Sequence, residues 1–464
     1  MKILLIRYHG RGTVNSREVK NIACSMGIWP PLGLLYLGAA LKQQGHDVQV
    51  LDVMTSGLDS GRAREMIAAA QSDIVGITAT TPEIRGVMEA ARFARRTGAR
   101  VVAGGPHLGM FAAETVSSPD IDFAVQGDGE IPLVRLLEEI ESPHPDFSTV
   151  PGLVYKDGQD INSNGTYIEH DLDGLPMPDW SLVERNTYSR IDALKPVATM
   201  ITARGCPHRC GFCYRGPDGS VVRYRSPGAV VDEMEFLAQR WGVREIIFAN
   251  DTLTLNRDMV MTMCEELLNR GIQLRWQGAT RVDAVDPEVL TLMKRAGCKQ
   301  LKFGIESGSD AILQLMAKGI TREQSRRALG WCRQIGIRTG AYFILGYVGD
   351  NERTIQQTLD FARELDPDFV MFYAGVPLPG TDFHSRAVQA EKIDPDYWCD
   401  YVQGKRNDRL PYLVSDLDQW IRRAFRRFYG RPSYLLKQLF RRDMWSALLR
   451  NPSLVLRLFF PDNT

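Results

Sequence analysis

The strongest constraint on the fold is an alternation of short apolar runs with helical patterns, which begins at the first residues of the chain. Runs rich in Val, Ile and Leu are separated by segments whose apolar residues follow helical spacing. This alternation is typical of a parallel sheet with crossover helices. We therefore predict an α/β domain of Rossmann-like type over residues 1–145. Its strands are expected at Lys2–Arg7, Val48–Asp52, Asp73–Ile77, Arg100–Ala103 and Ile121–Val125.

The alternation lapses and then resumes in the second half of the chain. Residues 146–195 have no clear periodicity and contain Pro151, Pro176 and Pro178, so they are expected to form a linker. From residue 196 to 385, about six strand and helix units indicate a partial (β/α)6 barrel. The expected strands are Thr199–Ala203, Glu245–Ala249, Gln273–Thr280, Lys299–Gly304, Arg338–Leu345 and Phe369–Tyr373.

The tail, residues 386–464, is expected to be a helical region. Between Arg422 and Arg457 it carries ten Lys or Arg residues and one acidic residue, interleaved with Phe, Tyr, Leu and Trp. One interpretation is a helical cap that packs on the barrel and leaves its arginines in solvent. The other is a peripheral membrane contact through residues 421–460, because basic faces beside aromatic residues suit an interfacial helix.

The composition excludes several classes of partner and location. Lys plus Arg number 56 and Asp plus Glu also number 56, so no nucleic-acid partner is expected. The longest uncharged apolar stretch, Trp29–Leu41, is shorter than the ~20 residues that span a bilayer. The start has too short an apolar run for an export signal, and a cytoplasmic location is expected. Eight cysteines in such a chain are better interpreted as thiols or metal ligands than as disulfides.

Three cysteines lie together directly after the first expected strand of the barrel. Cys206, Cys210 and Cys213 are separated by three and two residues. Thiolates are the protein ligands of iron-sulfur clusters, and a 4Fe-4S cube normally needs four of them. Three local ligands leave one iron open to a substrate, as in catalytic metal sites. The alternative is a structural zinc site completed by His208 or by a distant cysteine, although the second C-x2-C pair usual in such sites is missing.

This loop, with Phe212 before the last cysteine, resembles the signature of the radical S-adenosylmethionine (SAM) superfamily. The resemblance implies that Cys206, Cys210 and Cys213 hold a 4Fe-4S cluster and that SAM chelates the open iron. An electron from the cluster then cleaves SAM to methionine and a 5′-deoxyadenosyl radical, which abstracts hydrogen from an unactivated carbon. The implied partner is an external one-electron donor of the flavodoxin or ferredoxin type.

Later segments of the barrel resemble the SAM contacts of that superfamily. The ends of the second and third strands correspond to contacts with the amino group and the carboxylate of SAM. A carboxylate after the fourth strand corresponds to an acceptor for the ribose hydroxyls, and the fifth strand lines the adenine pocket. The residues implied in cofactor binding are Phe212, Asn250, Asp251, Arg281, Glu306, Ile344 and Gly346.

The first domain resembles the cobalamin-binding domain that precedes the barrel in some members of the superfamily. Glycines after the strand ends, Gly104-Gly105 and Gly127 with Gly129, let a bulky corrin approach the backbone. Cobalamin domains that supply a histidine to cobalt carry a D-x-H-x-x-G motif after the first strand. Here His9 stands at the histidine position, and the acidic partner is absent.

Taken together, these resemblances predict a cobalamin-dependent radical SAM enzyme. The expected reaction is methylation of an unactivated carbon in a natural product, pigment or lipid, so the expected substrate is a small molecule or lipid-like compound. One alternative is a radical SAM enzyme without methyl transfer, which would form a ring, as the anaerobic cyclase of chlorophyll synthesis does, carry out another oxidation, or couple carbons of lipid chains. A non-enzymatic alternative is a metal-stabilised binding module. No catalytic side chain is assigned from the sequence.

Overall fold

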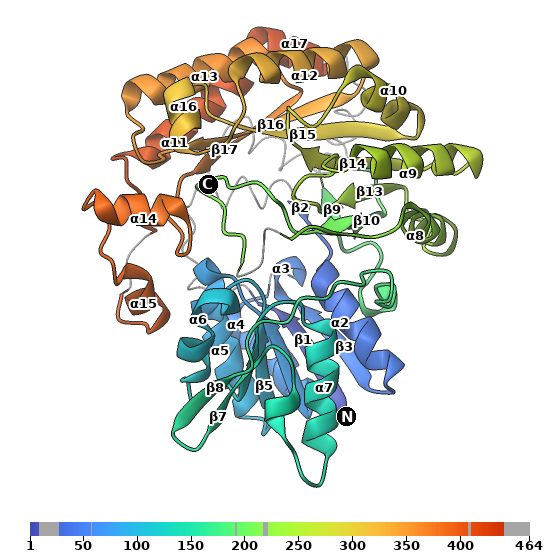
Figure 1. Cartoon of the computed structure of the whole chain (residues 1–464), viewed down its shortest axis with the longest axis vertical. Helices are drawn as coiled ribbons and strands as arrows, with labels where there is room; N and C mark the ends of the chain where they lie inside the picture. Colours follow the sequence, from blue (N-terminus) through green and yellow to red (C-terminus); the bar gives the residue numbers. More distant parts are fainter. Residues whose placement is uncertain (9–26, 57, 191–192, 217–220, 407–409, 440–464) are drawn as a thin grey trace.

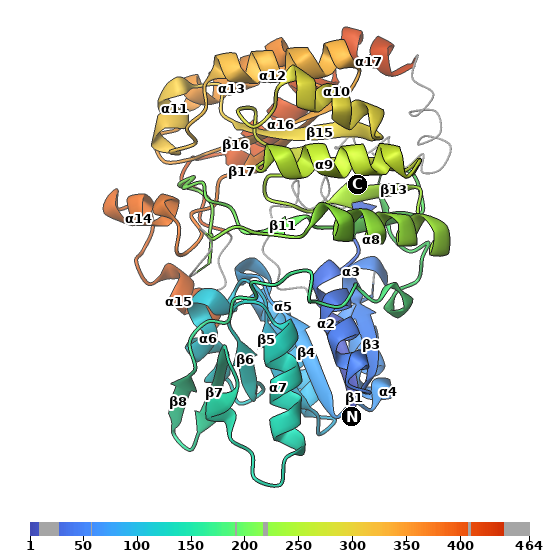
Figure 2. The same ribbon diagram turned by 45° about the vertical axis from the view of Figure 1, so that its right-hand side comes forward.

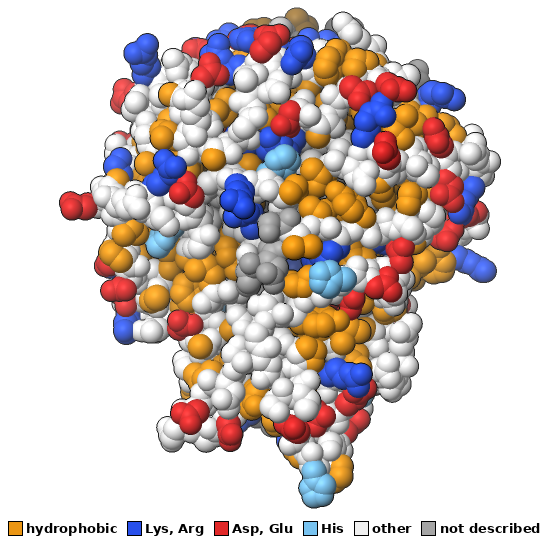
Figure 3. Space-filling view, in the orientation of Figure 1, with side chains coloured by type: hydrophobic (Ala, Val, Ile, Leu, Met, Phe, Trp, Pro, Cys, Tyr) orange, Lys and Arg blue, Asp and Glu red, His pale blue; other side chains and the backbone are white. Residues whose placement is uncertain are grey.

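Two sheets, one in each half of the chain, organise the molecule (Figure 1). The computed structural model describes residues 1–8, 27–56, 58–190, 193–216, 221–406 and 410–439. The first sheet and its helices lie at one end of the molecule, and the second sheet lies at the other (Figures 1 and 2). Basic and acidic side chains are interspersed over the face drawn in Figure 3, in keeping with their equal numbers.

Among the described residues, the first sheet has seven strands in the order β3-β1-β4-β5-β6-β7-β8. Its first five strands are parallel, as the apolar runs predict. Apolar residues on both faces form separate cores beneath the crossover helices, which is why the strands are nearly continuous apolar runs. The strands are β1 Lys2–Arg7, β3 Asp47–Asp52, β4 Ile74–Thr78, β5 Arg100–Gly104 and β6 Phe123–Val125, and the helices are α2 Leu32–Gln43, α3 Val53–Ser56, α4 Ser60–Ala70, α5 Ile84–Arg95, α6 Leu108–Val116 and α7 Glu130–Glu141.

The sheet continues past residue 145, the boundary predicted from sequence. The strands β7 Leu153–Asp157 and β8 Asp160–Ser163 add to its edge as an antiparallel hairpin. Both lie in the segment predicted as a linker. Short exposed edge strands bury few residues, so their sequence pattern is weak. Between residues 164 and 196, the described part of the chain has only the short turns and bridges expected of a connector. They include η3 Trp180–Leu182 and β9 Ser189–Arg190, which pairs with β2 Gly27–Ile28.

The second sheet is a partial (β/α)6 barrel, as predicted. Its six parallel strands follow chain order, and helices cover its outer surface. A small hairpin, β11 Ala203–Arg204 with β12 Arg223–Tyr224, follows the first strand. The strands are β10 Val197–Met200, β13 Glu245–Phe248, β14 Arg275–Thr280, β15 Cys298–Glu306, β16 Arg338–Leu345 and β17 Phe369–Ala374, and the helices are α8 Pro227–Arg240, α9 Arg257–Asn269, α10 Pro287–Arg295, α11 Asp310–Leu315, α12 Arg322–Ile335 and α13 Glu352–Leu365.

The described part of the C-terminal region is helical, as predicted, and contacts both domains. The helices are α14 Asp382–Gln389, α15 Tyr397–Val402, α16 Leu417–Tyr429 and α17 Pro432–Leu439. Aromatic residues of α15 join the core of the first domain, and both views place α15 beside α6. The apolar face of α16 packs against β17. Within the described ranges, no helix combines the length and apolar character needed to cross a membrane.

Candidate active site

The three clustered cysteines lie in the loop of the β11–β12 hairpin. Gly205 begins this loop with a φ of +90°, and a Cβ there would lie 2.2 Å from the carbonyl oxygen of Val221. Between the second and third cysteines, the amide of Gly211 donates to the carbonyl of Met316 at 2.7 Å. The carbonyl of Gly211 accepts from the amide of Phe383 at 2.7 Å. The middle of the loop is therefore anchored to the barrel on both sides.

All three thiols line one cavity and are neither in disulfides nor deeply buried. Burial raises the pKa of Cys213 to about 11 and also raises the pKa of Cys210. Two cations act in the opposite direction on Cys210: Lys318, and Arg281, whose guanidinium donates to its sulfur at 3.7 Å. Cations beside a sulfur favour the thiolate, which is the form that binds metal. The two cations therefore offset part of the effect of burial, although the pKa of Cys210 stays above its usual value.

The sulfur arrangement fits a cluster whose irons are spread over several thiolates. Across the residues that the structure describes, no three His, Cys, Asp or Glu side chains converge as ligands of a single metal ion would. In a 4Fe-4S cube each cysteine binds a different iron, so convergence on one point is not required. The three-thiol loop lines a cavity of about 480 Å³ and would hold such a cluster beside it, with fewer protein ligands than the cluster has irons.

Polar side chains from successive strand ends face the same cavity. Glu306 ends β15 after a register shift and has a φ of +67°. Its carboxylate accepts from the Lys318 ammonium at 2.8 Å, and both side chains are buried. Arg281, after β14, donates to the Asp283 carboxylate at 2.9 and 2.8 Å and to the Lys318 carbonyl at 2.8 Å. Two cations and a carboxylate thus lie together in the wall beside the thiols.

Lys318 was not predicted from the sequence. It follows Ala317 and precedes Gly319, both with positive φ, in the turn after α11. Its ammonium also lies 5.5 Å from the ring centre of Phe212 in the cysteine loop. In the sequence, Gly319 indicated only that the chain turns here. The fold places Lys318 beside Glu306.

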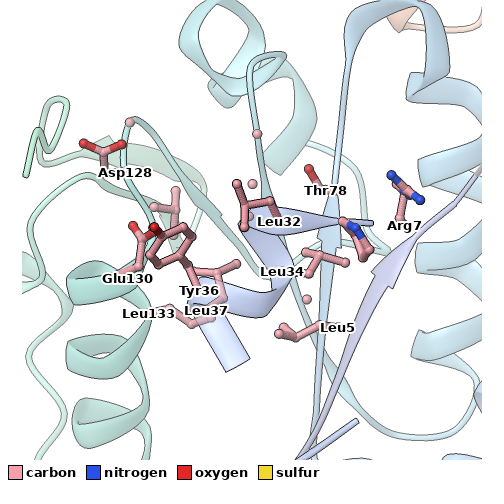
Figure 4. Close-up of a pocket in the computed structure, with 18 of the residues that line it drawn as sticks. Leu5, Arg7, Leu32, Leu34, Tyr36, Leu37, Thr78, Asp128, Glu130 and Leu133 are labelled. Carbon is pink, nitrogen blue, oxygen red and sulfur yellow. The ribbon is translucent and has the colours of Figure 1, made fainter. Parts of the chain in front are cut away.

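A second cavity, of about 570 Å³, opens at the C-terminal edge of the first sheet (Figure 4). It is lined by strand-end residues including Arg7 and Thr78, and by the predicted glycines Gly104, Gly105, Gly127 and Gly129. A Cβ on Gly104 would meet no heavy atom within 4 Å, whereas one on Gly105 would lie 2.7 Å from a backbone oxygen. Gly104 therefore leaves open space that a flat ligand could fill.

The two cavities share a wall that both domains build. Gly127 and Asp128 of the first domain, and Gly205 and Asp251 of the barrel, line both. Burial raises the pKa of the Asp251 carboxyl. A ligand in the first-domain cavity would therefore lie next to one at the cysteine loop.

Several predicted site residues lie elsewhere. Asn250 lines neither cavity, because its side chain accepts from the Thr202 amide at 3.1 Å and donates to the Thr202 hydroxyl at 2.9 Å. Ile344 packs in an apolar cluster, and a Cβ on Gly346 would contact Leu417 of α16 at 2.9 Å. Neither lines the cysteine cavity. His9 lies outside the described residues.

Comparisons with known proteins agree with this two-cavity arrangement. A model of the radical SAM superfamily matches residues 200–362, and a model of the B12 binding domain matches residues 19–137. A protein named as an uncharacterized methyltransferase of Pyrococcus horikoshii is 30% identical over 95% of each chain. The anaerobic magnesium-protoporphyrin IX monomethyl ester cyclase of Rubrivivax gelatinosus is 33% identical over 77% of this chain and 66% of its own length.

A solved structure shares the fold of both domains. The radical SAM methyltransferase TsrM of Kitasatospora setae, with cobalamin and a 4Fe-4S cluster bound, superposes with a TM-score of 0.67 at 22% identity. The match covers 85% of this chain and 76% of TsrM. The fold and the two cavities define an enzyme class that joins a B12 binding domain to a radical SAM barrel. This chain belongs to the radical SAM superfamily, in the group with an N-terminal B12 binding domain. Its family cofactors are a 4Fe-4S cluster and SAM, together with cobalamin.

Proposed function

We propose that this enzyme transfers a methyl group to an unactivated carbon of a small-molecule substrate bound between its two cavities. The observation that carries the proposal is the shared wall, where Gly127, Asp128, Gly205 and Asp251 line both cavities. Adjacent sites let one substrate meet both cofactors, and holding reactants together removes much of the entropic barrier. The methyltransferase name of the Pyrococcus horikoshii relative supports the same reaction.

We assign the cluster to Cys206, Cys210 and Cys213, and SAM to the polar wall beside them. The Arg281 and Lys318 cations suit the SAM carboxylate, and the buried Glu306 carboxylate suits the ribose hydroxyls. Phe212 and Asp251 complete this part of the cavity. We assign cobalamin to the glycine-lined cavity of the first domain, where Gly104 leaves room for the corrin.

When bound, the cluster and SAM supply a carbon-centred radical that removes hydrogen, and cobalamin supplies the methyl group. The chain contributes by orienting and enclosing the reactants. The anchored cysteine loop holds its ligands in place through Gly211, and the paired side chains of Glu306 and Lys318 limit movement in the cavity wall. Enclosure by the two domains keeps water away from reactive species.

The substrate class remains that of the sequence prediction: a natural product, a pigment or a lipid. Tyr214, Ile168 and Tyr342 line the cysteine cavity beside the charged residues, which suits a compound with an apolar or aromatic body. A lipid-facing role for residues 421–460 stays a prediction. The apolar residues Ile421, Phe425 and Phe428 of α16 are buried against the barrel, and residues 440–460 lie outside the described part of the chain.

A second candidate is a radical reaction without methyl transfer. The named cyclase of Rubrivivax gelatinosus, similar over 77% of this chain, favours ring formation on a pigment as that alternative. In both reactions the radical removes a hydrogen atom from the substrate. They differ in whether the SAM methyl group appears in the product.

The test uses the full chain, reconstituted anaerobically with iron, sulfide and hydroxocobalamin and supplied with a one-electron donor such as reduced flavodoxin. SAM with a deuterated methyl group is added with a metabolite extract of the source organism, and products are compared by mass spectrometry. A compound that gains the deuterated methyl group with the wild-type protein, but not with Cys210→Ala, supports methyl transfer. Formation of 5′-deoxyadenosine with loss of hydrogen from a compound, and no label gained, favours the cyclase-like reaction.

A further inference from the structure

We propose that Asp128 is a positioning residue that fixes the cysteine loop relative to the cobalamin cavity. The inference rests on the binding of both cofactors and not on which group is transferred. It concerns a set of buried charges between the domains, which we call the joint. The joint consists of Asp128 and Glu130 of the first domain and Arg204 and Arg223 of the β11–β12 hairpin, and it also contacts the connector at Glu169. Figure 4 shows Asp128 and Glu130 together at one side of the cavity of the first domain.

Asp128 connects three segments of the chain. Its carboxylate accepts from Arg204 of β11 at 2.8 Å and also from Arg223 of β12. It accepts from the backbone amide of Glu169 in the connector at 2.9 Å, and its own amide donates to the carbonyl of Tyr167 at 2.9 Å. A single side chain between two glycines of the first domain therefore joins both strands of the hairpin to the connector.

Arg204 extends this joint to Glu130. Its guanidinium donates to the Glu130 carboxylate at 2.7 Å, while it donates to Asp128 with its other amino group. Arg204 stands two residues before Cys206, and Asp128 lies between Gly127 and Gly129, which line the cobalamin cavity. The shortest covalent path from this joint to a cluster ligand is therefore two residues. Asp128, Glu130 and Arg204 are themselves part of the wall of the cobalamin cavity.

The neighbouring glycine makes the joint close-fitting. Gly127 has a φ of +97°, and a Cβ there would lie 2.0 Å from the Tyr167 carbonyl oxygen. Only glycine permits this approach between the first domain and the connector. The Asp128 loop therefore has little freedom to move independently of the connector.

The charges in the joint are shielded from solvent and mutually compensated. The side chains of Arg204, Asp128, Glu130 and Arg223 are 16%, 14%, 5% and 10% exposed. Burial alone would raise the pKa of Asp128, but Arg204 and Arg223 hold it below its usual value. Loss of one member of a buried, compensated set leaves its partner charged without a counterion, which favours a rearrangement of the segment.

This joint matters because the reaction needs two cofactors in two domains to act on one substrate. A displacement of about 1 Å in a reacting group can slow a reaction on the order of 100-fold. Asp128 and Glu130 also line the cobalamin cavity, but their ion pairs are with the hairpin and not with Cys206, Cys210 or Cys213. The positioning role therefore acts through Arg204, Arg223 and the backbone of the hairpin.

The test compares Asp128→Asn with the matched control Asp122→Asn. Asp122 lies at the other end of β6, where it too accepts from an arginine, Arg95 at 2.8 Å, and from a backbone amide, Val101 at 2.8 Å. Each protein is loaded with the cluster and hydroxocobalamin and reduced to the paramagnetic cluster and cob(II)alamin. Pulsed electron paramagnetic resonance then measures the distance distribution between the two centres.

We expect wild type and Asp122→Asn to give one narrow distribution, and Asp128→Asn to give a broader or shifted one in the molecules that carry both the cluster and cobalamin. Arg204→Lys keeps the charge but not the two-pronged contact, and it should move the distribution in the same direction. If Asp128→Asn does not fold, Arg204→Lys alone decides. A wild-type distribution in every cofactor-loaded variant would overturn the proposal.

Discussion

At the scale of single residues, burial determines the charge of His107, at the start of α6. Its ring stacks on Phe111, and its Nδ1 lies 3.0 Å from the Thr81 hydroxyl. Among the described residues its Nε2 has no partner. Burial lowers the pKa of His107 from 6.5 to about 4, so the folded protein keeps it neutral where an unfolded chain would be protonated. His107 supports the first domain and does not line the cobalamin cavity.

The difference in the pKa of His107 between the folded and the unfolded protein predicts a loss of stability in mild acid. Above pH 6.5 His107 is neutral in both the folded and the unfolded state, so the free energy of unfolding does not depend on it. As the pH falls toward 4, the unfolded chain binds a proton that the folded protein does not, and the free energy of unfolding decreases. The loss is up to about 1.4 kcal/mol per pH unit. His107→Phe keeps a flat ring and cannot titrate, so its thermal midpoint should fall less between pH 7 and pH 5 than that of wild type. The exposed His144→Gln variant should behave as wild type, and equal pH slopes for His107→Phe and wild type would refute the assignment.

The pair of Lys318 and Glu306 makes a second residue-scale prediction. Each side chain is 8% exposed, and their charged atoms lie 2.8 Å apart. Lys318→Met leaves a buried carboxylate without its cation, which should cost about 3 kcal/mol. The double variant Lys318→Met with Glu306→Gln removes both charges and should recover much of that loss. Thermal melts of wild type, Lys318→Met, Glu306→Gln and the double variant, all without cofactors, measure the coupling, and additive losses would show that the two residues act independently.

At the scale of elements, α16 closes the open edge of the barrel. The strand β17 ends the second sheet, so its outer backbone groups have no neighbouring strand. The Tyr429 hydroxyl of α16 accepts from the Val370 amide at 3.0 Å and donates to the Val370 carbonyl at 2.8 Å. One side chain thus satisfies both groups of an edge residue. This explains why the apolar face of α16 lies on the barrel.

Tyr429→Phe should therefore destabilise the barrel edge locally. Removing the hydroxyl leaves a buried amide and carbonyl without this partner, at a cost of about 1–3 kcal/mol. Hydrogen exchange followed by mass spectrometry should show faster exchange at the Val370 amide and in α16. In the first domain, Tyr155→Phe provides a control that also loses one hydroxyl. Unchanged exchange at Val370 would mean that this contact does not protect the strand.

The elements also show what sequence patterns can and cannot predict. Most of the parallel strands of the two sheets carry buried apolar residues that pack against the flanking helices, so their pattern is strong. The hairpin of β7 and β8 and the helix α15 were not predicted individually. The short strand β8 has no buried residue, so it lacks an apolar pattern. The helix α15 has only six residues, and its apolar side chains are buried because they contact the first domain.

The residues of the candidate site also include some that sequence motifs predict and some that they do not. The cysteine loop and the glycines of the first domain could be read from local motifs, and the structure places them on two adjacent cavities. Lys318 and the Asp128 joint could not, because each depends on contacts between distant segments: 12 residues separate Lys318 from Glu306, and 76 separate Arg204 from Asp128. A motif can indicate a ligand, but it does not show which distant side chain will hold that ligand in place.

At the scale of the whole molecule, the cavity of the first domain is completed by the barrel. Six of its lining residues, including Ala203, Gly205 and Asp251, come from the barrel, and the others come from the first domain. A ligand that fills this cavity therefore contacts both domains. Because such a ligand binds only the folded arrangement, it should stabilise both domains together.

Hydroxocobalamin should accordingly slow hydrogen exchange in the full-length apo-protein on both sides of the joint, in the loops after β5 and β6 and in residues 201–205. At a ligand concentration of about 100 times Kd, linkage predicts about 2.7 kcal/mol of added stability. Gly104→Val should abolish the effect while leaving the apo-protein stable, because a Cβ at Gly104 meets no heavy atom within 4 Å and its side chain would occupy the cavity. Gly330→Ala, which adds a methyl group in equally open space on α12, should respond as wild type. Protection confined to the first domain would contradict a cavity shared by the two domains, and normal binding by Gly104→Val would remove cobalamin from that cavity.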